Sequence, residues 1–238
     1  MQYTRRLLIA ALGSAPMMGW SQTPAECSSP SLGALSQRMG KAWLCTADAE
    51  LAVPARQVLA ASQTAFEQQL VQMHQRPASP EQAGGLRALA RRYEDYQALL
   101  AGTPGADGHR ALLSTSNEML TLAQIANNMR AGLSWQARLA GHQRLLSQRV
   151  ALLGLANPGN ESTRRERQSA IYEFEAGLQA LRNAGDATLR ERLALADAAW
   201  TPLKDGASAG RPVPVFIASE RLLAVMEAIT EHCTRQSS

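Results

Sequence analysis

The chain has 238 residues, a formal net charge of +4, and 45% hydrophobic but only 5% aromatic residues. This length is enough for one or two domains with a buried core. Basic residues are scattered, and the cluster at 164–167 is interrupted by an acid, which argues against nucleic acid as a partner. Alanine and leucine are abundant, and long segments lack proline and glycine. The composition therefore predicts an all-α protein.

The N-terminus, residues 1–25, is predicted to be a cleaved signal peptide. Arg5 and Arg6 precede an apolar segment that is too short to span a bilayer easily. Small residues allow cleavage near Ser21 or Ala25. The arginine pair also resembles a twin-arginine signal, so Sec and twin-arginine export are both open. An uncleaved membrane anchor is the alternative. We expect a soluble protein in the periplasm.

Helix breakers divide the rest of the chain into predicted helices. Pro54 suits the first turn of a helix, whereas Asn157-Pro158-Gly159 ends one. The segment 110–156 contains no proline, and its interior glycines are few, which predicts one long helix or two nearly continuous ones. Gly132 is its weakest point. The other predicted helices are 32–47, 54–76, 80–102, 162–184, 187–203 and 215–232.

Four short motifs occur twice in the same order, which predicts an internal duplication. We therefore expect two tandem four-helix bundle units, residues 30–130 and 131–234. They would share a long central helix and stack end to end. The matched motifs are 36–39 with 147–150, 66–70 with 174–178, Tyr96-Leu99-Gly102 with Trp200-Leu203-Gly206, and 116–120 with 219–223.

The predicted helix that contains residues 140–149 has two unusual faces. One face is an apolar stripe typical of a core. The opposite face carries Gly141, Arg144 and Gln148 among leucines, where a solvated helix would carry several charges. Glycine allows another backbone to come close, and an arginine among apolar residues needs an anionic partner. We interpret this face as an anion-binding contact surface. The alternative for Arg144 is a salt bridge to a neighbouring helix.

The pattern A-G-x-Q-R-x-L-S-Q-R at 140–149 resembles the P-box helix of the PilJ/NarX-type periplasmic sensor domain. That four-helix domain occurs in type IV pilus chemotaxis transducers and nitrate/nitrite sensor kinases. The similarity covers residues 134–233 well and 32–129 more weakly. The ten-residue motif is fairly specific, whereas the remaining matches are generic for helices.

The resemblance implies an anion site between two copies of this helix, where two subunits meet. Gly141 and Arg144 would be the main contacts, with Gln148 beside them, and the protein would be a homodimer. Arg149 would have a structural role, paired with a carboxylate of the bundle. Arg149, His142 and Arg38 are secondary candidates for the site. In the first unit Pro30 and Gly33 replace the glycine and arginine, so that unit is expected to keep the scaffold without the anion contacts.

Enzymatic and metal chemistry are not indicated. None of the four histidines follows a glutamate by three residues, so the di-iron motif is absent. The sequence contains no zinc, haem, phosphate-loop or nucleophile-elbow pattern. We expect no catalytic residues, cofactor or metal. Cys27 and Cys45 could form a disulfide in an oxidising compartment, leaving Cys233, although the spacing allows other pairings.

The favoured hypothesis is a periplasmic ligand-binding protein that senses a small oxyanion, with nitrate and nitrite as the favoured ligands. Its signal would pass to a separate membrane partner such as a sensor kinase or chemotaxis transducer. The alternative is a non-catalytic helical scaffold that has lost its ligand.

Overall fold

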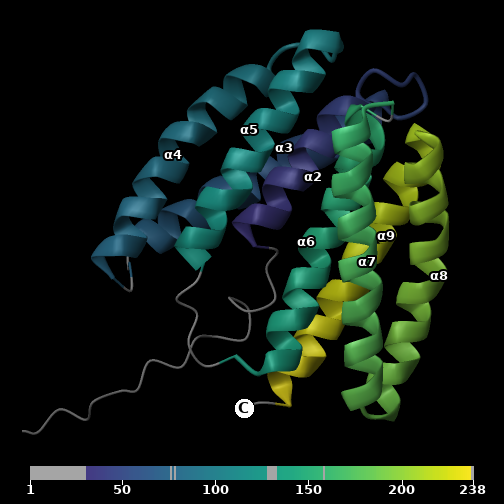
Figure 1. Cartoon of the computed structure of the whole chain (residues 1–238). Coiled ribbons are helices and arrows are strands. Elements are labelled where there is room, and N and C mark those ends of the chain that lie inside the picture. Colours follow the sequence, from purple (N-terminus) through teal and green to yellow (C-terminus); the bar gives the residue numbers. More distant parts are fainter. Residues whose placement is uncertain (1–30, 76, 78, 128–132, 158, 237–238) are drawn as a thin grey trace, which may run out of the picture.

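The computed structural model of the chain describes residues 31–75, 77, 79–127, 133–157 and 159–236. The described residues form helices joined by short turns and include no strand, which confirms the predicted all-α class (Figure 1). None of these helices is long and apolar enough to cross a bilayer. The helices are α2 (Leu32–Cys45), α3 (Ala52–Gln75), α4 (Pro80–Leu100), α5 (Ala106–Asn127), α6 (Trp135–Ala156), α7 (Glu161–Ala184), α8 (Ala187–Ala209) and α9 (Pro212–Arg235).

Short polar side chains set the starts of most helices. Each accepts a hydrogen bond from a backbone N–H three residues later and so satisfies a donor that the first helical turn leaves unpaired. At the other end of α8, Gly210 has a φ of 63°, which favours glycine. Helix α8 ends just before this glycine, so it extends past Pro202 and beyond its predicted end at residue 203. The capping residues are Ser31, Ser79, Ser134, Asn160 and Asp186.

The predicted long central helix is wrong. Helix α5 ends at Asn127, and α6 begins only at Trp135. Ser134 has a ψ of 159°, outside the helical range, and its hydroxyl accepts from the N–H of Ala137 at 3.2 Å. This cap starts a new helix, a signal that the search for proline and glycine missed. Gly132 lies outside the described residues.

The two predicted units lie side by side and not end to end (Figure 1). Helices α2–α5 surround one apolar core, and α6–α9 surround another. Helix α2 packs along α6 in parallel, with Gly33 against Leu145 and Gly40 against Leu152. The prediction of end-to-end stacking depended on the shared helix and fails with it.

The interiors of the two units make matching contacts, which support the predicted duplication. Gln37 donates to the carbonyl of Ser116 at 3.2 Å, and Gln148 donates to that of Ser219 at 3.0 Å. Ser36 and Ser147, the neighbours of these glutamines, each donate to the carbonyl three residues earlier at 2.8 Å. The first helix of each unit is therefore tied to the last helix in the same way.

The aromatic pairs also match but correct one sequence equivalence. Phe66 stacks on Tyr93 with ring centroids 4.4 Å apart, and Phe174 stacks on Trp200 at 4.1 Å. Each second ring also donates to the glutamate that follows its phenylalanine. Tyr93 is therefore the counterpart of Trp200. The predicted counterpart, Tyr96, lies about one turn later and instead donates to the carbonyl of Ser36.

Candidate functional site

The face of α6 predicted to be a contact surface does make a contact, but within the chain. Leu145, Gln148 and Leu152 are buried where α2 and α9 pack against α6. A second copy of α6 cannot meet this face while α2 covers it. Within the chain, the equivalent helix α2 packs on the face where a second subunit was predicted, and the homodimer itself stays a prediction.

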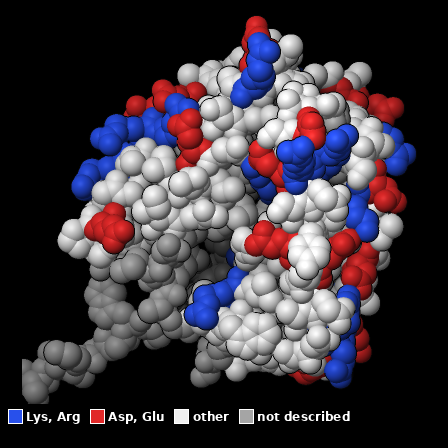
Figure 2. Space-filling model, in the orientation of Figure 1, with Lys and Arg blue, Asp and Glu red and all other residues white. Residues whose placement is uncertain are grey.

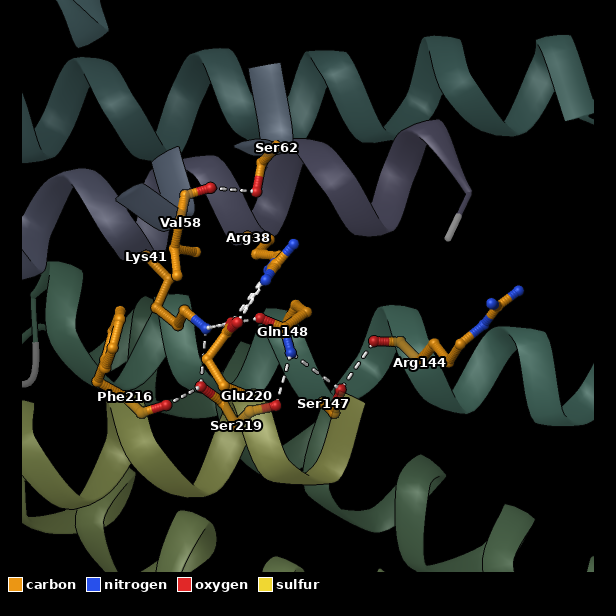
Figure 3. Close-up of polar contacts among 10 residues, drawn as sticks. All are labelled: Arg38, Lys41, Val58, Ser62, Arg144, Ser147, Gln148, Phe216, Ser219 and Glu220. Atoms are coloured by element: carbon orange, nitrogen blue, oxygen red, sulfur yellow. Dashed lines mark hydrogen bonds and ion pairs between the residues drawn. The ribbon is translucent and has the colours of Figure 1, made fainter. Parts of the chain in front are cut away.

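Arg144 lies at this seam between the units and is only 3% exposed. A Cβ built on Gly141 would be 3.8 Å from the Nη2 atom of Arg144, so the guanidinium lies next to this glycine, one turn earlier on α6. Figure 3 shows the side chain of Arg144 extending away from the other labelled polar side chains. Gly141 and Arg144 are thus brought together, as predicted.

The carboxyl group of Glu227 on α9 lies within electrostatic range of Arg144. Burial raises the pKa of Glu227, and the charges of Arg144 and Arg38 oppose that rise. The predicted anionic partner of Arg144 therefore has a counterpart within the chain. A carboxyl group near Arg144 is compatible with both interpretations of this arginine, as a ligand of a bound anion and as a partner of a neighbouring helix.

A second set of polar side chains at the seam surrounds Lys41 of α2, whose side chain is fully buried (Figure 3). Its ammonium donates to Gln148 Oε1 at 2.9 Å, Ser219 Oγ at 2.8 Å and Glu220 Oε1 at 2.6 Å. The ring of Phe216 lies 5.3 Å from Nζ. All three N–H donors of the ammonium are thus used, which offsets the cost of burying its charge.

Glu220 joins Lys41 to Arg38. Its Oε1 accepts from Arg38 Nε at 3.0 Å, and its Oε2 forms an ion pair with Arg38 Nη2 at 2.5 Å. Burial opposes the charge of this carboxylate, but the two cations lower the pKa of Glu220 to about 2. Burial lowers the pKa of Lys41, and Glu220 counteracts this effect. The cluster ties α2 of the first unit to α9 of the second.

The other predicted site residues have structural contacts. Gln148 uses its Oε1 for Lys41 and its Nε2 for the second unit, so it holds the seam and has no donor turned toward Arg144. Arg149 forms an ion pair with Glu166 at 2.7 Å, which confirms the predicted carboxylate pairing. His142 contacts Glu173 at 2.8 Å on the outer side of α6.

The first unit was expected to lack the anion contacts, and the described residues of the two units differ at this place. Gly33, the counterpart of Arg144, packs against Leu120 and Leu145. Pro30, the counterpart of Gly141, lies outside the described residues. Where Gly33 of α2 packs against Leu145, the described part of the seam thus carries one arginine, which α6 supplies.

Sequence reasoning did not single out the ion cluster. Lys41 was not among the candidate residues, and Glu220 was included only in the repeat match at 219–223. A usable signal was present, since Lys41 lies among apolar residues on α2 and Glu220 is followed by an apolar segment of α9. Which carboxylate meets which cation depends on helix packing, and no local pattern reveals that.

Among the described residues, the cysteines and the remaining charges add no further chemistry. Cys45 is buried beside α9, where burial raises the pKa of its thiol to about 12, and Cys233 lies in a different core. No disulfide joins these two, and Cys27 lies outside the described residues. Among the residues that the structure covers, no group of side chains could hold a metal ion. Figure 2 shows positive and negative side chains interspersed on the visible face.

No family model, curated protein or solved structure matches this chain.

Proposed function

We propose that this protein binds one small oxyanion, such as nitrate or nitrite, at the seam between its two four-helix units. Arg144 would supply the charge, and Gly141 would leave room for the ligand beside the α6 backbone. The observation that carries the proposal is an arginine that is 3% exposed and lies next to a glycine at the junction of two equivalent helices. The resemblance of 140–149 to the PilJ/NarX-type motif, which implies an anion at these two positions, supports the proposal.

The arrangement changes the expected stoichiometry. In a homodimeric site two identical arginines would face each other, whereas here α2 occupies the place of the second helix and carries Gly33 at that level. One chain would therefore hold one anion with one arginine, and dimerisation would not be required. The bound anion would change the packing of α2 against α6, and a separate membrane partner would detect that change.

Export to the periplasm remains part of this proposal. It depends on Arg5, Arg6 and the apolar segment after them. Mass spectrometry of the periplasmic fraction would test it, with loss of the first 21 to 25 residues expected. A membrane-retained chain with an intact N-terminus would contradict it.

A calorimetric titration of the purified protein with nitrate and nitrite tests the binding proposal. Sulfate and chloride serve as comparison anions. The parent protein should bind one nitrate per chain. Arg144→Ala should reduce the affinity by about 100-fold, in line with the loss of a charged hydrogen bond in a desolvated site. The matched control is Arg138→Ala, which removes an exposed arginine from the first turn of the same helix.

The scaffold alternative is favoured by one observation. Arg38 and Lys41, the cations of α2 at the seam, are both paired with Glu220. If no anion gives a measurable heat, or if Arg144→Ala binds like the parent, the protein is better described as a helical scaffold. Arg144 would then serve as a partner of α9.

A further inference from the structure

Helix α9 carries two glutamates on the face that meets the seam. Glu220 and Glu227 are seven residues apart, about two helical turns, so their side chains leave the helix in nearly the same direction. Glu220 is fully engaged with Arg38 and Lys41. Glu227 is half-buried and lies farther along α9. Among the described residues, the ion pairs that join α2 to α9 involve the first of these carboxylates.

Helix packing brings Glu227 to the level of the guanidinium of Arg144. Helices α6 and α9 are antiparallel, because α6 begins and α9 ends at the same end of the molecule (Figure 1). Gln148 contacts Ser219, so the earlier residues of α6 lie beside the later residues of α9. Side chains on a helix lean toward its N-terminus, and that of Arg144 lies next to Gly141. The guanidinium of Arg144 therefore lies closer to the level of Glu227 than the backbone of Arg144 does.

The charges around Glu227 come from three elements. Arg144 of α6 and Arg38 of α2 favour its ionised form, whereas Glu231, one turn later on α9, and burial disfavour it; burial has the largest effect, and the pKa of Glu227 is raised. Helix α8 also packs on α9, and its Arg192 donates to the carbonyl of Ala228. Glu227 thus lies near Arg144, but the ionised form of its carboxyl group is only weakly stabilised.

We propose that Glu227 competes with the bound anion for Arg144, so that anion binding is coupled to the uptake of one proton by Glu227. This inference rests on the proposed function, because it concerns the same site. Two anions beside one guanidinium in a desolvated seam repel each other strongly. A neutral Glu227 removes that repulsion and can donate a hydrogen bond to an anion oxygen. Protonation of Glu227 thus removes one competitor of the ligand for Arg144.

The coupling fixes the direction of the pH dependence. Above the pKa of Glu227, each anion that binds must bring one proton with it, so the affinity falls by up to about tenfold per pH unit. Below that pKa, Glu227 is already protonated and the affinity becomes independent of pH. The protein would respond to nitrate more strongly in an acidic environment than in a neutral one.

Nitrate titrations of the full protein between about pH 4.5 and 8 test the inference. The parent should lose affinity as the pH rises. Glu227→Gln, which resembles the protonated side chain, should bind tightly with little pH dependence and exceed the parent by about tenfold or more at the upper end of the range. Glu231→Gln, which removes a carboxylate one turn later on the same helix, should keep the slope of the parent's pH dependence and move its midpoint to lower pH, because Glu231 disfavours the charged form of Glu227.

A second measurement separates the inference from the proposed function. The carboxyl resonance of Glu227, followed by NMR without any added anion, reports its pKa directly. Arg144→Gln should raise that pKa further, because the cation that favours the charged form is removed. An unchanged pKa, or equal pH profiles for the parent and Glu227→Gln, overturns the inference while leaving nitrate binding intact. Failure of every variant to bind nitrate at any pH overturns the proposed function and the coupling with it.

Discussion

The units α2–α5 and α6–α9 make equivalent contacts in their interiors but differ where they meet. At the seam, Lys41 of the first unit is the counterpart of Leu152, and Glu220 of the second is the counterpart of Asn117. The buried ion cluster is therefore present on one side of the pseudo-symmetric seam. Because the two units are similar, their copies could pair at this seam in two similar ways. The ion cluster is present on one side of the seam, so these two ways of pairing differ in energy. The cluster favours a single register of α2 against α9.

The largest effect is expected from removing one half of that cluster. Glu220→Ala leaves the fully buried Lys41 without its counter-charge and should lower the free energy of unfolding by about 3–5 kcal/mol. The control is Asn117→Ala at the equivalent position, where no buried cation depends on the side chain. Its cost should stay below about 1 kcal/mol. Equal losses in urea denaturation would contradict an asymmetric seam.

Acid should weaken the same contact. The pKa of Glu220 is about 2 in the folded protein and about 4.3 in an unfolded chain. A lowered folded-state pKa contributes stability above the unfolded value, and this is lost as the pH falls toward the folded value. We expect about 3 kcal/mol of stability to disappear between about pH 4.5 and 2 in the parent. In the double variant Lys41→Met/Glu220→Gln this loss should be much smaller, which urea denaturation at several pH values can measure.

A smaller effect is expected where the two interiors diverge. Gly154 of α6 lies so close to α8 that an added Cβ would be 2.6 Å from the Cα of Ala207. The counterpart of Gly154 in the first unit is Trp43, a large buried side chain. Gly154→Ala should therefore destabilise by about 1–3 kcal/mol, because two backbones must move apart. Gly105→Ala, with open space around its Cβ position, should change the melting temperature little.

The helical class, most helix positions and the duplication could be predicted from the sequence because they depend on local patterns. Proline, glycine and repeated motifs are visible along one chain, and so was the unusual face of α6. The arrangement of the units was not accessible in the same way. It depends on the cap at Ser134 and on which apolar face covers which, and the shared-helix prediction failed at that point.

The arrangement of the candidate site residues could be predicted only in part, for the same reason. Gly141 and Arg144 lie on consecutive turns of one helix, so their proximity follows from spacing alone. Lys41, Glu220 and Glu227 come from helices far apart in the sequence, and each is an ordinary charged residue in its own segment. Their relation arises only when α2, α6 and α9 pack together. Gln148 could be assigned to a contact face of its helix but not to its actual partners.

The smallest effect is expected at Gln143, where the second unit has a polar residue and its counterpart in the first unit is the core residue Leu32. Gln143 is fully buried against Gly177, and neither of its amide atoms has a hydrogen-bond partner among the described residues. Such an amide loses its hydration without replacement. Gln143→Met keeps the length of the side chain and removes both polar atoms, so it should raise the free energy of unfolding by about 1 kcal/mol.

The matched control for that change is the same substitution at Gln37. This glutamine is also fully buried, but its amide donates to Ser116 and accepts from Arg149. Gln37→Met should therefore destabilise by about 1–3 kcal/mol, because it leaves those partners unsatisfied. Opposite signs in paired urea denaturation curves would show that the hydrogen-bonded glutamines hold the fold and that Gln143 does not. A loss of stability in Gln143→Met would mean that its amide has a favourable contact, such as an ordered water, which the first unit does not need at Leu32.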